Sequence, residues 1–483
     1  MIAIRVATSF LVLLLVSSAA AEGMDQREGT HEGADFIVSV PGNWNGGLVM
    51  YAHGYEGEGP GRGTVQFSPL SSHLAARGIA WAATGYRAVT YRPDWFLEDV
   101  LALRQRFIRD VGPVRWTVIH GLSMGGHVAV AGLELHPEIF QAGLTECGVV
   151  DGVGLVDWLY AYTAAAEYFS GAPLLDTPRP AFGTVVNEKM VPALGTPGSY
   201  TERGRAFDNV VKHLSGGDVA MRLEGLTRRY LANLNPRAPG PRAAREFARH
   251  ADTRSIRYAI DPGFGIDGET LNRDIRRIEP PPGARSRSEN PVFADLTGKL
   301  PVPLMTLHET ADFRVPLVLE RNYRQKVEAA GHGKRLVQRV VAGAGHCAID
   351  GRLREQAFDD LLAWIENGAT PSGDDLSGDL GRLGRQTGSR SRAMPLPGKQ
   401  RIIAAGAIGN LLEWYDFATP WRFQRRTREP QEAFVSICVH LWLLKSSKSD
   451  PCRRWHRASG QPALRYPRRI PPARPPSAPS RCA

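Results

Sequence analysis

Cysteine is scarce in this sequence, which has five in 483 residues. Cys438, Cys452 and Cys482 lie close to the C-terminal end, so the body of the chain contains only Cys147 and Cys347. In an exported domain two such residues are a natural candidate for a disulfide, and two free buried thiols are the alternative. HxH and HExxH spacings are both missing, so no pattern predicts a metal site, and we expect neither a metal nor a cofactor.

Long apolar runs are also few. The first 21 residues contain an apolar run at 10–16 behind an early arginine, and they end in three alanines. A run this short does not span a bilayer, whereas the whole pattern is typical of a secretory signal peptide, residues 1–21, that is cleaved before Glu22. We therefore expect a secreted or periplasmic protein without stable membrane insertion.

Excess charge is missing from the body of the chain, although the formal net charge of the whole is +10. Residues 419–483 contain 14 Lys and Arg against 3 Asp and Glu, whereas residues 1–418 contain 45 against 46. The basic character therefore belongs to the C-terminal segment. Since the body is almost neutral, we expect no nucleic-acid partner.

Strand and helix patterns alternate over residues 22–150 and again over 300–368. The strand-like runs are 34–40, 47–52, 79–84, 116–119, 142–147, 304–307 and 336–341, and the helical patterns are 94–110, 124–135, 316–330 and 356–365. Such alternation with continuously apolar strands predicts an α/β fold with a doubly wound, mostly parallel sheet. The two blocks form the first and second parts of one core.

The segment between the blocks, residues 151–299, differs in composition. It begins with a cluster of aromatic residues and continues with helical, arginine-rich sequence. We expect a mainly helical cap inserted over the carboxyl edge of the sheet. Its aromatic side chains line a pocket or pack the cap onto the core, and its arginines favour an anionic substrate or form a solvated surface.

From residue 369 the chain becomes rich in Gly, Ser, Asp and Arg, which predicts a disordered basic tail over 369–483. Within it, residues 399–418, KQRIIAAGAIGNLLEWYDFA, resemble the first membrane helix of major-facilitator symporters. No later span of about 20 apolar residues follows, so a transporter is excluded. We interpret this fragment as read-through into a neighbouring gene; a basic interaction tail and a weak membrane anchor are the alternatives.

Residues 116–126, WTVIHGLSMGG, place a serine between glycines at the end of an apolar run. The run has the character of a buried strand, and the residues after Ser123 have the character of a packed helix. A serine in such a strand-to-helix turn adopts a strained backbone, and glycine-sized neighbours let strand and helix pass closely. Ser123 is thus a candidate nucleophile, and a capping serine in a tight turn is the alternative.

An activated serine needs a base, a carboxylate and donors for an oxyanion. Asp312 follows one later strand and His346 follows the last, so both lie at carboxyl ends of strands, where ligands bind in open α/β sheets. Oxyanion donors are expected from the backbone of Met124 and from that of Tyr55 or Gly54. The competing bases are His53, His120 and His308, and the competing carboxylates are Glu309 and Glu146.

The order of Ser123, Asp312 and His346 at strand ends resembles the α/β-hydrolase superfamily across residues 34–365. The resemblance implies Ser123 as nucleophile, His346 as general base and acid, and Asp312 as the carboxylate that orients it. It implies an exported serine hydrolase acting on a small-molecule or lipid-like ester. The alternatives are a peptidase of the prolyl-oligopeptidase type, whose propeller has no counterpart here, and a binding protein that has lost the chemistry. The sequence does not indicate the oligomeric state.

Tannases and fungal feruloyl esterases of this superfamily carry cysteines beside both serine and histidine, joined as a disulfide. Here Cys347 follows His346 directly, but Leu122 precedes the serine, so only half of that pattern is present. Cys147, at the end of the next strand, is expected to lie at the same sheet edge. A bridge between Cys147 and Cys347 is therefore our hypothesis.

Overall fold

The computed structural model describes residues 23–237, 249–286 and 296–384. The chain divides into two units, 1–417 and 418–483, and every described residue belongs to the first. The predicted signal peptide and the symporter-like fragment at 399–418 lie outside the described residues. Among the helices in those ranges, none is long and apolar enough to cross a membrane.

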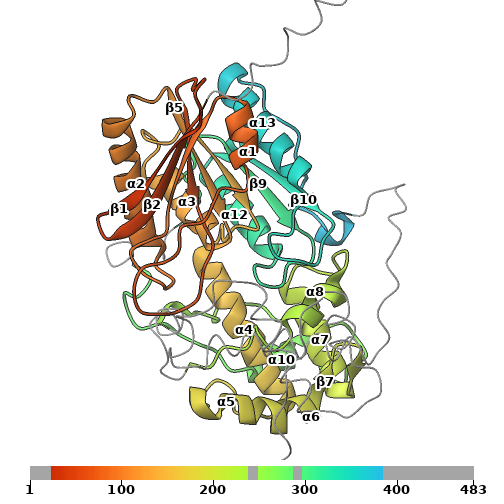
Figure 1. Ribbon diagram of the computed structural model, residues 1–483. Helices are drawn as coiled ribbons and strands as arrows, with labels where there is room; N and C mark the ends of the chain where they lie inside the picture. The colour runs from red at the N-terminus through yellow and green to blue at the C-terminus, as the bar shows by residue number, and fades with distance from the viewer. Residues whose placement is uncertain (1–22, 238–248, 287–295, 385–483) are drawn as a thin grey trace, which may run out of the picture. The chain divides into compact units, whose positions relative to one another are not determined.

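An eight-stranded sheet forms the core, in the order β1-β2-β4-β3-β5-β6-β9-β10 (Figure 1). Its strands are β1 (Asp25–His31), β2 (Ala34–Val40), β3 (Gly47–Ala52), β4 (Ala80–Thr84), β5 (Trp116–Leu122), β6 (Ala142–Glu146), β9 (Leu304–Glu309) and β10 (Leu336–Val341). β2 pairs antiparallel with β1 and β4, and all other neighbours run parallel. The predicted α/β class with a doubly wound, mostly parallel sheet is confirmed.

Helices cover both faces of this sheet. They are α1 (Ser71–Ala76), α2 (Pro93–Asp110), α3 (Met124–Leu135), α12 (Val318–Ala329) and α13 (Gly351–Asn367). One hydrophobic cluster contains apolar residues of α2, α3 and α12, and a second contains those of α1 and α13. β3, β4, β6 and β9 are buried along their whole length, so their residues do not alternate between buried and exposed positions, as in a parallel sheet covered on both faces.

A mainly helical insertion joins β6 to β9, as expected from residues 151–299. It contains α4 (Gly152–Ser170), α5 (Arg179–Val185), η1 (Val186–Met190), α6 (Val191–Leu194), α7 (Glu202–Leu214), α8 (Arg222–Arg229), α10 (Gly268–Asp274) and the short pair β7 (Gly195–Thr196) and β8 (Ser199–Tyr200). Trp158 of α4 lies edge-on to Phe313, with ring centroids 6.4 Å apart. The insertion therefore packs directly against the loop that carries Asp312.

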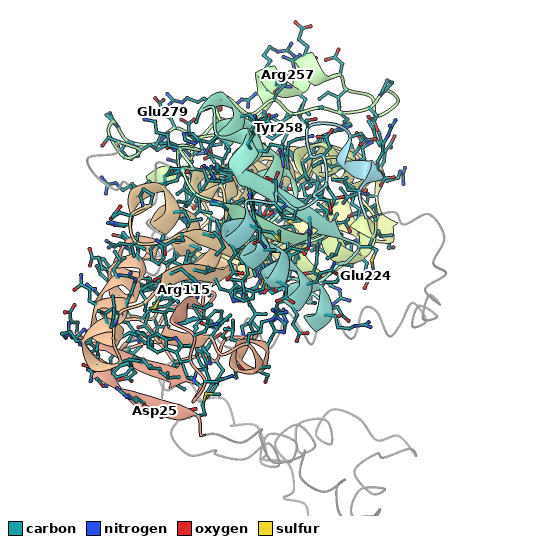
Figure 2. The ribbon with its side chains drawn as sticks, turned by 90° about the horizontal axis from the view of Figure 1, so that it is seen from above. Asp25, Arg115, Glu224, Arg257, Tyr258 and Glu279 are labelled. Atoms are coloured by element: carbon teal, nitrogen blue, oxygen red, sulfur yellow. A yellow bond between two sulfur atoms is a disulfide. The ribbon has the colours of Figure 1, made fainter. Side chains whose placement is uncertain are left out.

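Two features of the fold differ from expectation. β1 is an extra antiparallel edge strand that is exposed along almost its whole length, with Asp25 at the rim of the core (Figure 2). We also expected the core to end at residue 368, but the chain stays packed as far as Gly384: Leu376 and Leu380 are fully buried. Asp374 bonds the edge of β10 through its backbone and side chain.

Candidate active site

Ser123 occupies the sharp turn between β5 and α3. Its backbone is left-handed, with φ 53° and ψ −118°, a conformation that non-glycine residues adopt only when their surroundings enforce it. Ser123 N donates to Glu146 O of the neighbouring strand at 3.1 Å, and Ser123 O accepts from Val149 N at 3.0 Å. The turn is thus held on one side by β6 and the residues after it.

The glycines around Ser123 are required by close backbone contacts. A Cβ on Gly121 would lie 2.1 Å from Gly125 O, and a Cβ on Gly125 would lie 1.9 Å from Ala52 O. Any side chain at these positions would separate β5, α3 and β3. The GxSxG pattern therefore follows from the packing that brings the serine to the end of the sheet.

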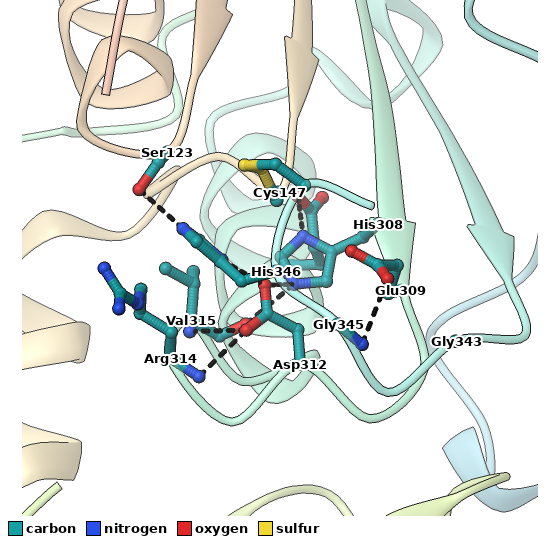
Figure 3. A network of polar contacts seen from close by, with 12 residues as sticks. Ser123, Cys147, His308, Glu309, Asp312, Arg314, Val315, Gly343, Gly345 and His346 are labelled. Carbon is teal, nitrogen blue, oxygen red and sulfur yellow. Dashed lines mark hydrogen bonds and ion pairs between the residues drawn. A yellow bond between two sulfur atoms is a disulfide. The ribbon is translucent and has the colours of Figure 1, made fainter. Parts of the chain in front are cut away.

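His346 joins Ser123 to Asp312. Its Nε2 lies 2.8 Å from Ser123 Oγ, and its Nδ1 donates to Asp312 Oδ2 at 2.6 Å (Figure 3). Ser123, Asp312 and His346 follow β5, β9 and β10, respectively. Asp312 lies 189 residues after Ser123 along the chain, and His346 lies 34 residues after Asp312. The structure brings together the nucleophile, base and carboxylate that the sequence predicts, within hydrogen-bonding distance.

Asp312 is fully buried, yet it is held in the charged form. Its Oδ1 accepts hydrogen bonds from the backbone N–H groups of Arg314 (2.8 Å) and Val315 (3.1 Å). Burial alone would raise the pKa of Asp312, but the charges of His346 and His308 and these hydrogen bonds outweigh burial and lower the pKa. An ionised carboxylate in this position stabilises an imidazolium on His346.

His308 lies behind Asp312 and is also fully buried. Its Nε2 donates to Val315 O at 2.7 Å and lies 3.8 Å from Asp312 Oδ2, while its Nδ1 lies 3.3 Å from Glu320 Oε1. Burial would lower the pKa of His308, but Glu320 and Asp312 raise it to about 9. His308 is therefore a buried cation between two carboxylates, and it does not contact Ser123.

The other competing bases also have different partners. His53 donates from Nδ1 to Gly54 O at 2.8 Å and stacks on Tyr86, with ring centroids 4.1 Å apart. His120 bonds the buried Glu146 at 2.8 Å. Among the described residues neither ring contacts Ser123, whereas that of His346 does.

The competing carboxylates are occupied elsewhere. Burial alone would raise the pKa of Glu146, but His120 and Arg354 outweigh it and lower the pKa. Both oxygens of Glu146 accept from Arg354 Nε at 2.7 Å. Glu309 instead accepts from the backbone N–H groups of Gly345 (3.2 Å) and Ala348 (3.0 Å), and so it holds the loop that carries His346.

Cys147 and Cys347 form a disulfide, with Cα atoms 5.2 Å apart. Cys147 follows β6, whose last residue bonds the backbone of Ser123, and Cys347 follows His346. A ring nitrogen of His346 and both sulfur atoms lie within 4.8 Å of one another, and Figure 3 shows Cys147 beside the Ser123–His346 pair. The bridge thus connects the end of β6, which is hydrogen-bonded to the Ser123 turn, covalently to the loop of His346.

The expected oxyanion donors lie around the serine. Met124 is the first residue of α3, and its side chain is buried. A Cβ on Gly54 would lie 3.8 Å from Ser123 Oγ, so the Gly54–Tyr55 backbone passes beside the nucleophile. Donation from the amides of Met124 and Tyr55 stays a prediction.

Sequence reasoning missed how Glu309 and Glu320 act in this site. The sequence indicates Glu309 only as a candidate partner for the base, whereas its carboxylate binds the backbone of the loop that carries His346. Glu320 and the charge on His308 were not anticipated. The sequence does not show which of these residues faces which partner. His308 and Glu309 are consecutive at the end of β9, and so they point to opposite faces of the sheet.

No protein-family model and no curated protein matches this chain. Among solved structures, an acylaminoacyl peptidase from Pyrococcus horikoshii has a TM-score of 0.37 and 13% identity over 75% of this chain, which covers only 44% of the peptidase's length. An esterase from Pyrococcus furiosus has a TM-score of 0.36 and 12% identity over 70% of this chain and 90% of its own. Feruloyl esterase B from Aspergillus oryzae has a TM-score of 0.43 and 12% identity over 72% of this chain and 81% of its own.

The strand order, the serine's turn after β5 and the sequential order of Ser123, Asp312 and His346 are those of the α/β-hydrolase fold. The three solved structures have TM-scores below 0.5, so their activities give no information about this site; the positions and contacts of its own residues do.

Proposed function

We propose that this protein is a serine hydrolase that cleaves a carboxylic ester through an acyl-enzyme. The observation that carries the proposal is the hydrogen-bonded series from Ser123 Oγ to His346 Nε2 and from His346 Nδ1 to Asp312. Activation of a serine hydroxyl requires a base within this distance and a carboxylate that fixes the base's tautomer. The buried, ionised Asp312 supports that role.

In the proposed reaction Ser123 Oγ attacks the ester carbonyl carbon, and its proton passes to His346 Nε2. The backbone N–H groups of Met124 and Tyr55 donate to the oxyanion that forms. Collapse of the tetrahedral intermediate expels the alcohol, which takes the proton from His346. Water then attacks the acyl-enzyme with His346 as base, and the acid product and free Ser123 are released.

We choose an ester over a peptide by analogy with capped enzymes of this fold. The geometry of Ser123, His346 and Asp312 is compatible with cleavage of either bond. A peptidase is the second candidate. Paired substrates with one acyl group and either an ester or an anilide leaving group distinguish the two. We expect hydrolysis of the ester at a much higher kcat/KM than that of the anilide.

Fluorophosphonate labelling of the full chain tests the proposal. We expect labelling of the wild type, none of Ser123→Ala, and strongly slowed labelling of His346→Ala. Ser199→Ala, an exposed serine of β8 in the cap, is the matched control and should label like the wild type. A folded wild type that does not react would refute the hydrolase, and a labelled Ser123→Ala would refute the nucleophile.

We also propose export, with cleavage before Glu22. The Cys147–Cys347 disulfide supports this, because such bridges persist in oxidising compartments. N-terminal sequencing of the protein recovered from the periplasm or medium tests it, and a protein retained in the cytoplasm with residues 1–21 attached contradicts it.

A further inference from the structure

Glu146 is a buried carboxylate beside the nucleophile that the proposed reaction does not use. It is the last residue of β6, and its backbone O accepts the N–H of Ser123 at 3.1 Å. Its side chain is fully buried, and burial alone would raise its pKa, but contacts with His120 and Arg354 outweigh burial and lower the pKa. Glu146 is therefore a buried anion whose own backbone holds the turn of the nucleophile.

Two basic side chains bind this carboxylate from different elements. Nε2 of His120, on β5, lies 2.8 Å from Glu146 Oε1. Arg354, on α13, donates from Nε to both carboxylate oxygens at 2.7 Å. Nη2 of Arg354 also lies 3.5 Å from the backbone O of Ile349, in the loop before α13. The carboxylate thus connects the strand of the nucleophile to the segment that follows the base.

The Arg354–Glu146 pair runs parallel to the disulfide. Glu146 precedes Cys147 directly, and Arg354 follows Cys347 by seven residues, so both connections join the end of β6 to the segment around the base. Glu309 attaches the same loop to β9 instead. Because the nucleophile's turn is hydrogen-bonded to β6, the pair and the bridge both act on the distance between nucleophile and base.

Stability alone does not account for a buried pair of this kind. The desolvation of two buried charges offsets much of their attraction, and replacing such a pair by neutral side chains of similar size often leaves stability unchanged or higher. The pair does supply direction, since charge-assisted hydrogen bonds fix the guanidinium relative to the carboxylate. The side chain of Arg354 is only 12% exposed, so solvent weakens these contacts little.

We infer that Arg354 and Glu146 are positioning residues for His346: their pair holds the loop of the base against the end of β6. The same pair keeps Cys147 and Cys347 close together when their bridge is reduced. The catalytic part of this inference rests on the proposed hydrolysis, whereas the effect on the disulfide does not require catalysis. Two glutathione molecules reduce the bridge to two thiols and become one glutathione disulfide. A pair that holds the two thiols together raises their effective concentration and so favours the bridge.

The variant Arg354→Met/Glu146→Gln tests the effect on the bridge. It removes both charges at once, so no unpaired charge stays buried, and the amide keeps an acceptor for His120. The full chain is equilibrated with glutathione buffers of known ratio, and alkylation with peptide mapping follows Cys147 and Cys347. We expect the equilibrium constant for formation of the bridge to fall by about tenfold.

Ester hydrolysis by the same variant tests the positioning of the base. With the bridge intact, kcat should fall by less than about threefold at unchanged KM, because the bridge still holds the loop. In the Cys147→Ala/Cys347→Ala background, the two substitutions should lower kcat by about a further ten- to hundredfold. Arg354→Lys keeps the charge but not the planar donor, and it should shift both measurements in the same direction by smaller amounts. This milder variant keeps the inference testable if the neutral pair does not fold.

Arg222→Met/Asp208→Asn is the matched control. This ion pair joins α8 to α7 within the cap at 2.7 Å, and its side chains are similarly buried, 13% and 18% exposed. The control should leave the glutathione equilibrium of the bridge unchanged. A wild-type equilibrium in Arg354→Met/Glu146→Gln, or equal losses of kcat with and without the bridge, would overturn the inference. A folded wild type that fluorophosphonate does not label would instead overturn the proposed function, and the disulfide measurement would still decide whether the pair holds the loop.

Discussion

Loss of the Cys147–Cys347 disulfide should impair catalysis more than it impairs folding. The bridge ties the end of β6, which bonds the backbone of Ser123, to the residue after His346. Glu309 holds the same loop independently through Gly345 and Ala348. Without the bridge the loop keeps these anchors, so the protein folds, but the His346 ring is less constrained relative to Ser123.

The size of both effects can be worked out. The bridge closes a loop of 200 residues, for which the chain-entropy relation gives about 5 kcal/mol of stabilisation, whereas measured disulfides contribute about 2–4 kcal/mol. For a domain of this size that corresponds to a fall in Tm of about 3–5 °C. A displacement of the base by about 1 Å costs on the order of 10²-fold in rate, so we expect kcat to fall by about ten- to hundredfold.

The assay compares the wild type with the double variant Cys147→Ala/Cys347→Ala, each with and without a phosphine reductant. Ester hydrolysis, fluorophosphonate labelling and thermal unfolding are measured on the full chain. The reductant should slow the wild type to the rate of the double variant and leave the double variant unchanged. That variant retains Cys438, Cys452 and Cys482, so it controls for reduction elsewhere.

Two results would refute the reasoning. Peptide mapping that finds Cys147 and Cys347 alkylated in the unreduced protein would show that the bridge is absent. Equal rates in the reduced and oxidised wild type, with the reduction verified by mass, would show that Glu309 and the surrounding packing suffice to hold His346.

Three further predictions concern side chains around the base. Asp312→Asn should lower kcat by about 10⁴-fold with little change in KM, because an amide stabilises neither the correct tautomer nor the imidazolium; kinetics at one pH test this, and near-wild-type kcat would contradict it. Glu309→Gln should lower the free energy of unfolding by about 0.5–1.5 kcal/mol in urea titrations, since one partly exposed backbone N–H of the His346 loop loses its charged acceptor, and an unchanged midpoint would count against the loop contact. The pKa of His308 is raised to about 9, above the 6.5 of a free histidine, so its stabilising contribution is complete below pH 6.5 and is lost as the pH rises to about 9. Thermal unfolding should show this decline in the wild type, and His308→Gln should lack it.

Several elements follow directly from the sequence. β2 and β3 were predicted with their observed bounds, because short apolar runs between turn residues are typical of buried strands. β1 was missed because its residues, DQREGTH, are polar and exposed; it pairs through its backbone with β2, a contact that side-chain pattern does not report. The packed segment 369–384 was missed for a related reason, since Leu376 and Leu380 are isolated apolar residues in polar sequence.

Some features of the candidate site could likewise be predicted from the sequence, and others could not. Ser123, Asp312 and His346 were found because each follows a strand, and parallel strands end at one edge. Side-chain direction, which the sequence does not give, distinguishes the four candidate histidines: His308 is in the last strand before the Asp312 loop, yet its ring faces Glu320 and Val315.

The left-handed backbone at Ser123, Cys147 and Cys347 has a consequence for how this protein can change. All three are non-glycine residues with φ between 46° and 59°, and glycine would adopt each conformation without penalty. Selection for stability alone would therefore favour glycine at Ser123 and remove the nucleophile. A variant library screened only for heat resistance should accumulate Ser123→Gly and drift toward an inert fold, but it should keep Cys147 and Cys347, because their bridge stabilises the fold more than glycine would. Alternating screens for turnover and heat resistance should retain Ser123 as well.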